Sequence, residues 1–142
     1  MNATRTPIAA WFIALACTGA YAQSTTTPNL ALKGYDVVAY FTGNKAQVGS
    51  PSFHADFDGM RYQFSSAQNK GVFSADPDRY LPQFGGYCAM GISKGKKFES
   101  DPTLWKIIDG KLYVFSSPTA SEAAGKDPEI LARARQQWQV MK

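Results

Sequence analysis

A ten-residue pattern that occurs twice constrains the fold of this chain more than any other feature. Residues 57–66 and 108–117 are identical at six of ten positions. Each copy carries an Asp-Gly pair between two β-prone runs, which is a strong hairpin signal because the tight turn requires positive φ at its central positions. After the first turn, Met60, Tyr62 and Phe64 alternate with polar residues, which indicates one buried and one wet face. The pattern therefore predicts two β-hairpins.

The recurrence of this pattern allows two interpretations. It is either an internal duplication or the same solution reached twice for a hairpin that runs into a helix. The residues that flank the two copies do not align in sequence. For that reason we favour the second interpretation.

Helix-start signals follow both hairpins. Capping boxes, with Gln or Glu three residues after the cap, begin at Ser65 and Thr119. Asp-Pro pairs at 76–77, 101–102 and 127–128 each place a capping acid before a proline that suits the first helical position. Five helix starts in so short a chain predict short helices.

The remaining elements complete an α+β domain. Residues 36–41, a run of β-branched and aromatic residues, are expected to form a strand, and residues 87–92 a central strand. Residues 104–108 should pair with 112–115 across the second Asp-Gly turn. The longest helix is expected from about Pro128, and its apolar side carries Ile130, Leu131, Ala134, Trp138 and Met141. The predicted fold is a small antiparallel sheet with short helices packed on one side and a longer C-terminal helix.

The first 22 residues have the pattern of a secretory signal peptide. Arg5 supplies a positive start, residues 8–17 form an apolar run, and Ala-Tyr-Ala at 20–22 matches a cleavage site. The apolar run has ten residues, whereas a membrane-spanning helix needs about 20. The sequence therefore predicts export without a stable membrane anchor.

Cleavage would leave a short spacer followed by one domain. We expect a signal peptide at 1–22, a flexible spacer at 23–31 and the domain at 32–142, located in the periplasm or secreted. A lipoprotein signal, with Cys17 as the lipidated residue, is a minor alternative, because Leu15 stands where a small residue is normally found. A chain of 142 residues that is 44% hydrophobic is long enough for one such core.

The charge distribution argues against nucleic acid as a partner. The formal net charge is +4, and no basic cluster is longer than the one at residues 94–97. A protein that follows a phosphate backbone needs a more extended basic surface. Gly85 and Gly86 are not followed by Lys and Ser or Thr, so they do not form a phosphate-binding loop.

Loss of the signal peptide would leave Cys88 as the only cysteine. A single cysteine cannot form an internal disulfide. In an oxidising compartment a lone thiol must be buried, bound to metal, capped, or paired with another chain.

The residues around Cys88 suggest a site. Gly85 and Gly86 allow positive φ or a close approach of another group, and Phe84 and Tyr87 would shield the thiol from bulk water. If the segment is extended, Cys88 and Met90 point to the same face, since they are two residues apart. Two soft sulfur ligands favour Cu(I) over Mg²⁺ or Ca²⁺.

Other interpretations of the same residues remain open. Free cysteine is among the most buried residue types, and methionine commonly fills gaps in a core. His54 is the only histidine, which excludes zinc sites with several histidines but leaves a Cys88–His54 dyad formally available. The sequence shows no third group that would orient such a dyad.

Several motifs together resemble the YHS-domain family, most closely its exported bacterial single-domain members. The resemblance covers residues 32–138 and is carried by segments 34–41, 62–66, 73–89 and 109–113, which include the Gly-Gly-Tyr-Cys-Ala block. The chain departs from the family pattern at Val37, where proline is usual.

This resemblance implies a compact α+β domain and some role in metal handling. Related domains accompany heavy-metal-transporting ATPases and multicomponent oxygenases, and copper binding is often proposed for them. The metal-associated relatives have several cysteines, so only Cys88 carries over as a ligand. We add Met90 and His54 as ligands on chemical grounds alone.

Three hypotheses about function follow. The first is a non-enzymatic exported domain that binds a soft metal ion, with copper as the expected ion, through Cys88 assisted by Met90 or His54; its partner would be a metal-handling or envelope protein. The second is a protein-interaction or structural domain in which the cysteine is buried and inert. The third and weakest is a thiol-dependent enzyme that uses Cys88 and His54.

Overall fold

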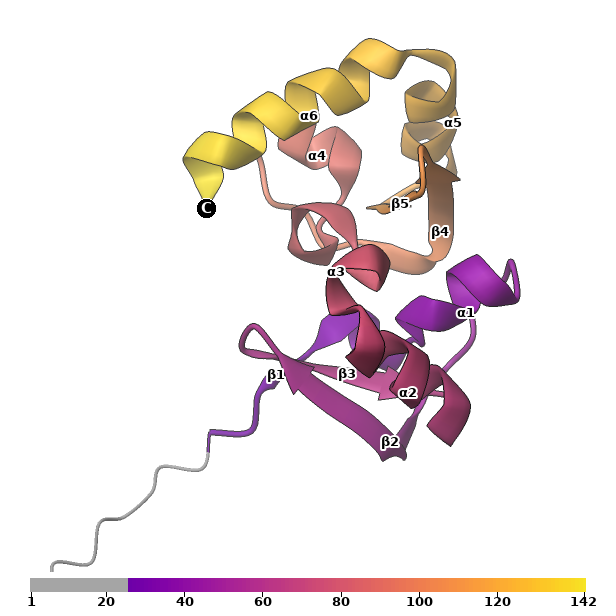
Figure 1. The fold of residues 1–142 in the computed structure, drawn as a ribbon. Helices are drawn as coiled ribbons and strands as arrows, with labels where there is room; N and C mark the ends of the chain where they lie inside the picture. Colours follow the sequence, from indigo (N-terminus) through magenta and orange to yellow (C-terminus); the bar gives the residue numbers. More distant parts are fainter. Residues whose placement is uncertain (1–25) are drawn as a thin grey trace, which may run out of the picture.

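The computed structural model describes residues 26–142, so the predicted signal peptide lies outside the described residues. The chain forms two halves, which we define as residues 29–80 and 81–141 (Figure 1). The elements of the first half are β1 (Asn29–Leu30), η1 (Ala31–Gly34), α1 (Val37–Thr42), β2 (Ser50–Phe57), β3 (Met60–Phe64), α2 (Ala67–Ala75) and α3 (Pro77–Tyr80). Those of the second half are η2 (Gln83–Gly86), α4 (Ala89–Ser93), β4 (Asp101–Ile108), β5 (Lys111–Phe115), α5 (Pro118–Lys126) and α6 (Pro128–Met141).

The sheets follow the two predicted hairpins. The first has the strand order β1-β3-β2, with β1 parallel and β2 antiparallel to β3, and the second consists of β4 and β5. Both hairpins are confirmed, as are the α+β class and the C-terminal helix α6, which at 14 residues is the longest of the described helices. The single antiparallel sheet that we expected is wrong, because the strands form two separate sheets.

The two halves repeat one unit with an offset of about 51 residues. Strand register is the same in both hairpins: Phe57 pairs with Met60 and Ile108 with Lys111, and both show an irregularity toward the start of the first strand. Helices α2 and α5 each have nine residues and follow a serine cap. Each unit also starts with a short 3-10 turn, η1 or η2, that contains residues at positive φ.

This correspondence extends into the flanks that differ in sequence. After each 3-10 turn a tyrosine N–H donates to a carbonyl three residues back, at 3.0 Å in the first half and 3.1 Å in the second. A parallel bridge from Pro82 to Leu112 stands where β1 pairs with β3. The structure therefore favours internal duplication over the independent origin that we favoured from sequence.

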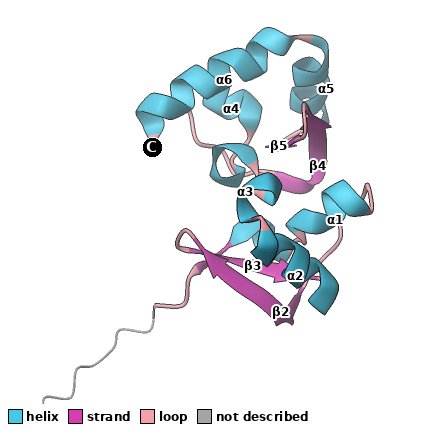
Figure 2. Ribbon diagram, viewed as in Figure 1, coloured by secondary structure: helices cyan, strands magenta, loops and turns pink. Residues whose placement is uncertain are grey.

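Two predicted strands are helices (Figure 2). Residues 36–41 were expected to be extended but lie mostly in α1, and residues 87–92 lie mostly in α4. The Asp-Pro pair at 101–102 begins strand β4 and not a helix. The caps before α2 and α5 are Ser66 and Ser117, one residue later and two residues earlier than predicted.

The folded part also starts earlier than the predicted domain boundary. Asn29 and Leu30 pair with β3, and Ala31 is 3% exposed, so the end of the segment 23–31 belongs to the fold and not to a spacer. Within residues 26–142, no helix is both long enough and apolar enough to cross a membrane.

The buried side chains form two core clusters, and the first of them also takes in Leu112 and Val114 of β5, so it joins the two halves. The aromatic ring of Phe73 lies at the centre of the first core, and Phe115 and Leu131 belong to the second. Between them, the Tyr40 hydroxyl donates to the Pro102 carbonyl at 2.7 Å, and the Tyr40 ring packs edge-on against Trp105 at 5.1 Å between centroids. The two halves are therefore tied by a buried hydrogen bond and an aromatic contact.

Tyr62 makes the stability sensitive to alkaline pH. Burial, aided by the nearby charge of Asp58, raises the pKa of Tyr62 to about 12. In the unfolded chain the pKa is near its ordinary value of about 10, so the folded state holds the proton more tightly. This contribution is complete below the unfolded pKa and is lost as the pH rises toward about 12. We expect urea midpoints to fall over this alkaline range and Tyr62→Phe to fall less; equal slopes for the two proteins would contradict the assignment.

Candidate functional site

The residue before α1 or α4, which we call the pre-helix position, joins each helix to its hairpin. In the first half it is Asp36, which is fully buried. One carboxylate oxygen accepts from Val38 N at 2.9 Å and Ala39 N at 3.3 Å, which caps α1. The other accepts from Ser65 N at 2.8 Å, Ser65 Oγ at 2.8 Å and Asn69 Nδ2 at 2.7 Å. A single carboxylate thus fixes the helix start to the end of β3.

Cys88 occupies the pre-helix position of the second half. It is 1% exposed, and its sulfur accepts from Ser116 N at 3.2 Å and Ser116 Oγ at 3.3 Å. Ser116 is the counterpart of Ser65, 51 residues later. The backbone of the two positions also matches, since Asp36 N donates to Gln47 O and Cys88 N to Phe98 O. Cys88 therefore makes the same connection as Asp36, with sulfur in place of carboxylate.

The cysteine makes this connection less completely than the aspartate does. Its side chain makes no capping hydrogen bond to α4. Asn69, which donates to Asp36 Oδ2 beside the two Ser65 donors, has Ala120 as its counterpart, and Ala120 has no polar side chain. The sulfur thus has two hydrogen-bond partners where the carboxylate has five donors.

This equivalence predicts the outcome of two substitutions at residue 88. Cys88→Asp should fold, because Ser116 offers its backbone and hydroxyl donors to residue 88 as Ser65 does to Asp36, although no counterpart of Asn69 adds a further donor. Cys88→Val, which has no acceptor, leaves the Ser116 donors without a partner, at a cost of about 1–3 kcal/mol. In urea denaturation we expect Cys88→Asp to be at least as stable as Cys88→Val. An unfolded Cys88→Asp beside a stable Cys88→Val would show that the two positions are not equivalent.

Met90 does not share a face with Cys88. The expectation that it would depended on an extended segment, but residue 90 lies in α4, and residues two apart on a helix do not face each other. The Met90 sulfur instead lies 3.8 Å from Ser93 Oγ, whose hydroxyl donates to the Met90 carbonyl at 2.7 Å.

His54 lies in the other half of the molecule. It is a residue of β2, at the far end of the molecule from α4 in Figure 1, whereas Cys88 belongs to the second core. Its Nδ1 lies 2.8 Å from the Pro51 carbonyl oxygen, within hydrogen-bond distance. The arrangement does not support a Cys88–His54 dyad. Among residues 26–142, no group of three or more His, Cys, Asp or Glu side chains could hold a metal ion.

The residues expected to form a pocket or position the backbone lie in and after η2. Phe84 and Gly85 line a groove of about 780 Å³ between the halves, and Gly85, Gly86 and Tyr87 line an adjoining cavity of about 400 Å³. Phe84 is buried and Gly85 has φ of +62°. Phe84 and Tyr87 pack against the same core as Cys88.

Two residues that we did not identify from the sequence complete this region. The Trp138 ring lies 6.1 Å from Phe84 and 6.4 Å from Tyr87 between centroids. The Lys97 ammonium lies over the rings of Tyr87 and Trp138, at 5.7 Å and 5.5 Å from their centroids, within the range of a cation–π interaction. The sequence placed Trp138 only on the apolar side of the last helix, and Lys97 only in the basic cluster at residues 94–97.

Comparison with known proteins gives no family assignment: no family model, no curated protein and no solved structure matches this chain.

Proposed function

We propose that this chain is a non-enzymatic binding domain that takes up a segment of a partner protein in the groove between its halves, with Cys88 as a buried structural residue. The observation that carries the proposal is the groove itself. It is lined by Leu32 and Met60 from the first half, by Phe84 and Gly85 of η2, and by Lys97 and Trp138 of the second half.

The chemistry of the lining indicates the kind of segment. Basic residues Lys97, Arg135 and Lys142 face the groove together with acidic Asp58 and Asp78. Lys97 lies on the Tyr87 and Trp138 rings, so a carboxylate that binds its ammonium would bring a neighbouring apolar side chain against Trp138. An extended segment with adjacent acidic and apolar residues fits this arrangement. Export, if it occurs as the first 22 residues suggest, would make an envelope protein the partner.

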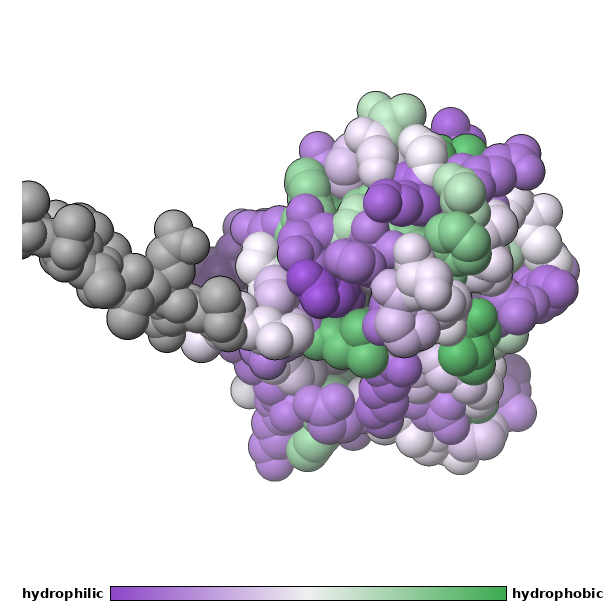
Figure 3. Space-filling view, turned by 90° about the horizontal axis from the view of Figure 1, so that it is seen from below, coloured by the Kyte–Doolittle hydropathy of each residue, from purple (hydrophilic) through white to green (hydrophobic). Residues whose placement is uncertain are grey.

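The rest of the surface supports a local binding site. On the face seen in Figure 3, hydrophobic residues form separate patches between hydrophilic ones. Large exposed hydrophobic side chains in the described part are Leu30, Val48, Phe98 and Val140. Scattered residues of this kind are normal on monomeric proteins and mark no separate site.

Site-specific photocrosslinking in intact cells tests the groove. A photoreactive residue at Gln139, which lines the groove, should give a discrete protein adduct, and one at Gln68, exposed on α2, should not. The adduct at 139 should disappear when Lys97→Glu is added. The proposal would be contradicted if positions 139 and 68 gave the same adducts or if position 139 gave none. An adduct at 139 that Lys97→Glu does not affect would also contradict it.

A second candidate function, soft-metal binding through Cys88, is favoured by one observation. The sulfur accepts two hydrogen bonds at a position that the other half fills with a carboxylate. Cysteine sulfur is a soft ligand of the kind that Cu(I) prefers. The described residues supply only this one ligand, so further ligands would come from a metal-handling partner. We also propose, from the motifs in segments 34–41, 62–66, 73–89 and 109–113, that the chain belongs to the YHS-domain family.

Anaerobic competition titration with Cu(I) tests the second candidate. If Cys88 binds the ion, Cys88→Ser should lose binding, and the matched variants Met90→Leu and His54→Gln should keep it. Equal binding by wild type and Cys88→Ser, or no binding by wild type, would exclude this function for Cys88.

A further inference from the structure

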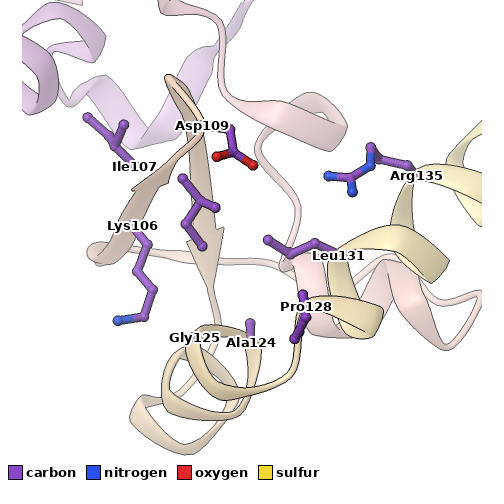
Figure 4. A pocket seen from close by; sticks show the side chains of 9 residues that line it. Lys106, Ile107, Asp109, Ala124, Gly125, Pro128, Leu131 and Arg135 are labelled. Atoms are coloured by element: carbon purple, nitrogen blue, oxygen red, sulfur yellow. The ribbon is translucent and has the colours of Figure 1, made fainter.

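The second half contains a further cavity, which neither Cys88 nor the aromatic residues around η2 line. Its volume is about 460 Å³, and it lies between the β4–β5 turn and helices α5 and α6 (Figure 4). The apolar side chains that line it are those of Ile108, Ala124, Pro128 and Leu131. We call it the α5–α6 cavity.

The duplication explains why this cavity exists. The counterpart of Ala124 is Phe73, 51 residues earlier, and that of Ile108 is Phe57. In the first half the Phe73 ring is 1% exposed and lies 6.1 Å from Phe57, 4.9 Å from Tyr62 and 5.1 Å from Phe64 between centroids. The second half keeps the hairpin and the helix but replaces this ring by a methyl group. The α5–α6 cavity lies between Ile108 and Ala124, so it opens where the Phe57–Phe73 contact of the sister unit has lost both of its rings.

Charged groups lie at the rim of the cavity. Figure 4 shows the Asp109 carboxylate and the Arg135 guanidinium on opposite sides of the mouth, and Lys106 beside α5. The Lys106 stem runs close to Gly125, where an added Cβ would lie 3.2 Å from Lys106 Cε. Arg135 is held in place by a hydrogen bond of 3.2 Å to the Tyr113 hydroxyl. Two cations and one carboxylate leave the rim with a net positive charge.

We propose that the α5–α6 cavity binds a small aromatic carboxylate, with its ring between Ile108 and Ala124 and its carboxylate at Arg135. Ligand pockets of this kind have about 300–1,000 Å³ and an apolar lining with few polar groups. An engineered apolar cavity of about 150 Å³ already holds benzene, so the space is ample for one ring. Arg135 lines both this cavity and the groove, so the filling variants below, which leave Arg135 in place, separate a failure of this site from a failure of the groove.

Protein NMR titration with phenylacetate tests the site, with benzyl alcohol as the neutral analogue. We expect saturable shifts of the Ala124, Gly125 and Leu131 amides. Ala124→Phe, which restores the ring of the sister unit, should weaken phenylacetate binding by at least roughly tenfold, since it fills the space for the ligand ring. Arg135→Gln should weaken phenylacetate but leave benzyl alcohol unchanged.

A second filling variant keeps the test decisive if Ala124→Phe does not fold. Ile108→Phe introduces the residue of the sister unit on the strand side and should also block binding. Undetectable binding to the wild type at millimolar phenylacetate, or wild-type affinity in a folded filling variant, would overturn the proposal. Equal loss of phenylacetate and benzyl alcohol in Arg135→Gln would overturn the role of the carboxylate.

Discussion

Replacing Asp36 by Ala is expected to lower the free energy of unfolding by about 3–5 kcal/mol, because it removes a helix cap and leaves several buried donors without an acceptor, which costs about 1–3 kcal/mol for a buried group. The carboxylate accepts from two backbone groups of α1, from Ser65 and from Asn69, and all of these donors would lose their partner. The loss of the cap alone costs about 0.5–2 kcal/mol. The remainder comes from the connection between α1 and the end of β3.

Urea denaturation of matched variants measures this effect. Asp76→Ala is the control, because Asp76 also precedes a helix but makes no side-chain capping bond to α3. Asp36→Asn should lie between Ala and wild type, since its amide oxygen can accept from only one side of the network. Similar midpoints for Asp36→Ala and Asp76→Ala would mean that the buried network contributes little to stability.

The second large effect is expected from Phe73→Ala, which should cost about 3–5 kcal/mol, as for other buried phenylalanines. The Phe73 ring contacts three aromatic rings of the hairpin, so its removal leaves a cavity that the rigid sheet cannot close. Thermal and urea unfolding would measure the loss. Phe98→Ala is the control, since Phe98 is 47% exposed and should lose much less. A small effect at Phe73 would contradict our explanation of the α5–α6 cavity as an unfilled ring position.

Local signals were enough to predict the hairpins and the last helix. The Asp-Gly turns fix strand pairing within a few residues, and the apolar periodicity after Pro128 predicts a helix. The same reasoning failed at residues 37–41, whose β-branched and aromatic side chains favour a strand. There the Asp36 cap decides the structure, and its donors Ser65 and Asn69 come from 29 and 33 residues away.

The candidate site was predicted only in part, for a similar reason. Cys88 was identified from its uniqueness, but its partner Ser116 lies 28 residues further along the chain. One signal could have found it. A Gly-Tyr pair precedes both Asp36 and Cys88, and a pair of serines ends both hairpins. Each of these motifs recurs after about 51 residues, which indicates that Cys88 and Ser116 stand where Asp36 and Ser65 stand in the first half. The direction of the Met90 side chain was predicted wrongly, because it depends on whether residues 87–92 form a helix or a strand. The local sequence did not distinguish the two.

The rate at which Cys88 is alkylated in the native protein tests the central claim, that this cysteine is a buried structural residue equivalent to Asp36. With iodoacetamide in increasing urea, we expect the thiol to react only in step with the unfolded population, because it is 1% exposed and engaged by Ser116. The destabilised Asp36→Ala variant should raise the rate in proportion to its loss of stability. Rapid alkylation without urea, at a rate close to that of an exposed cysteine, would contradict the claim and make the thiol itself the functional group.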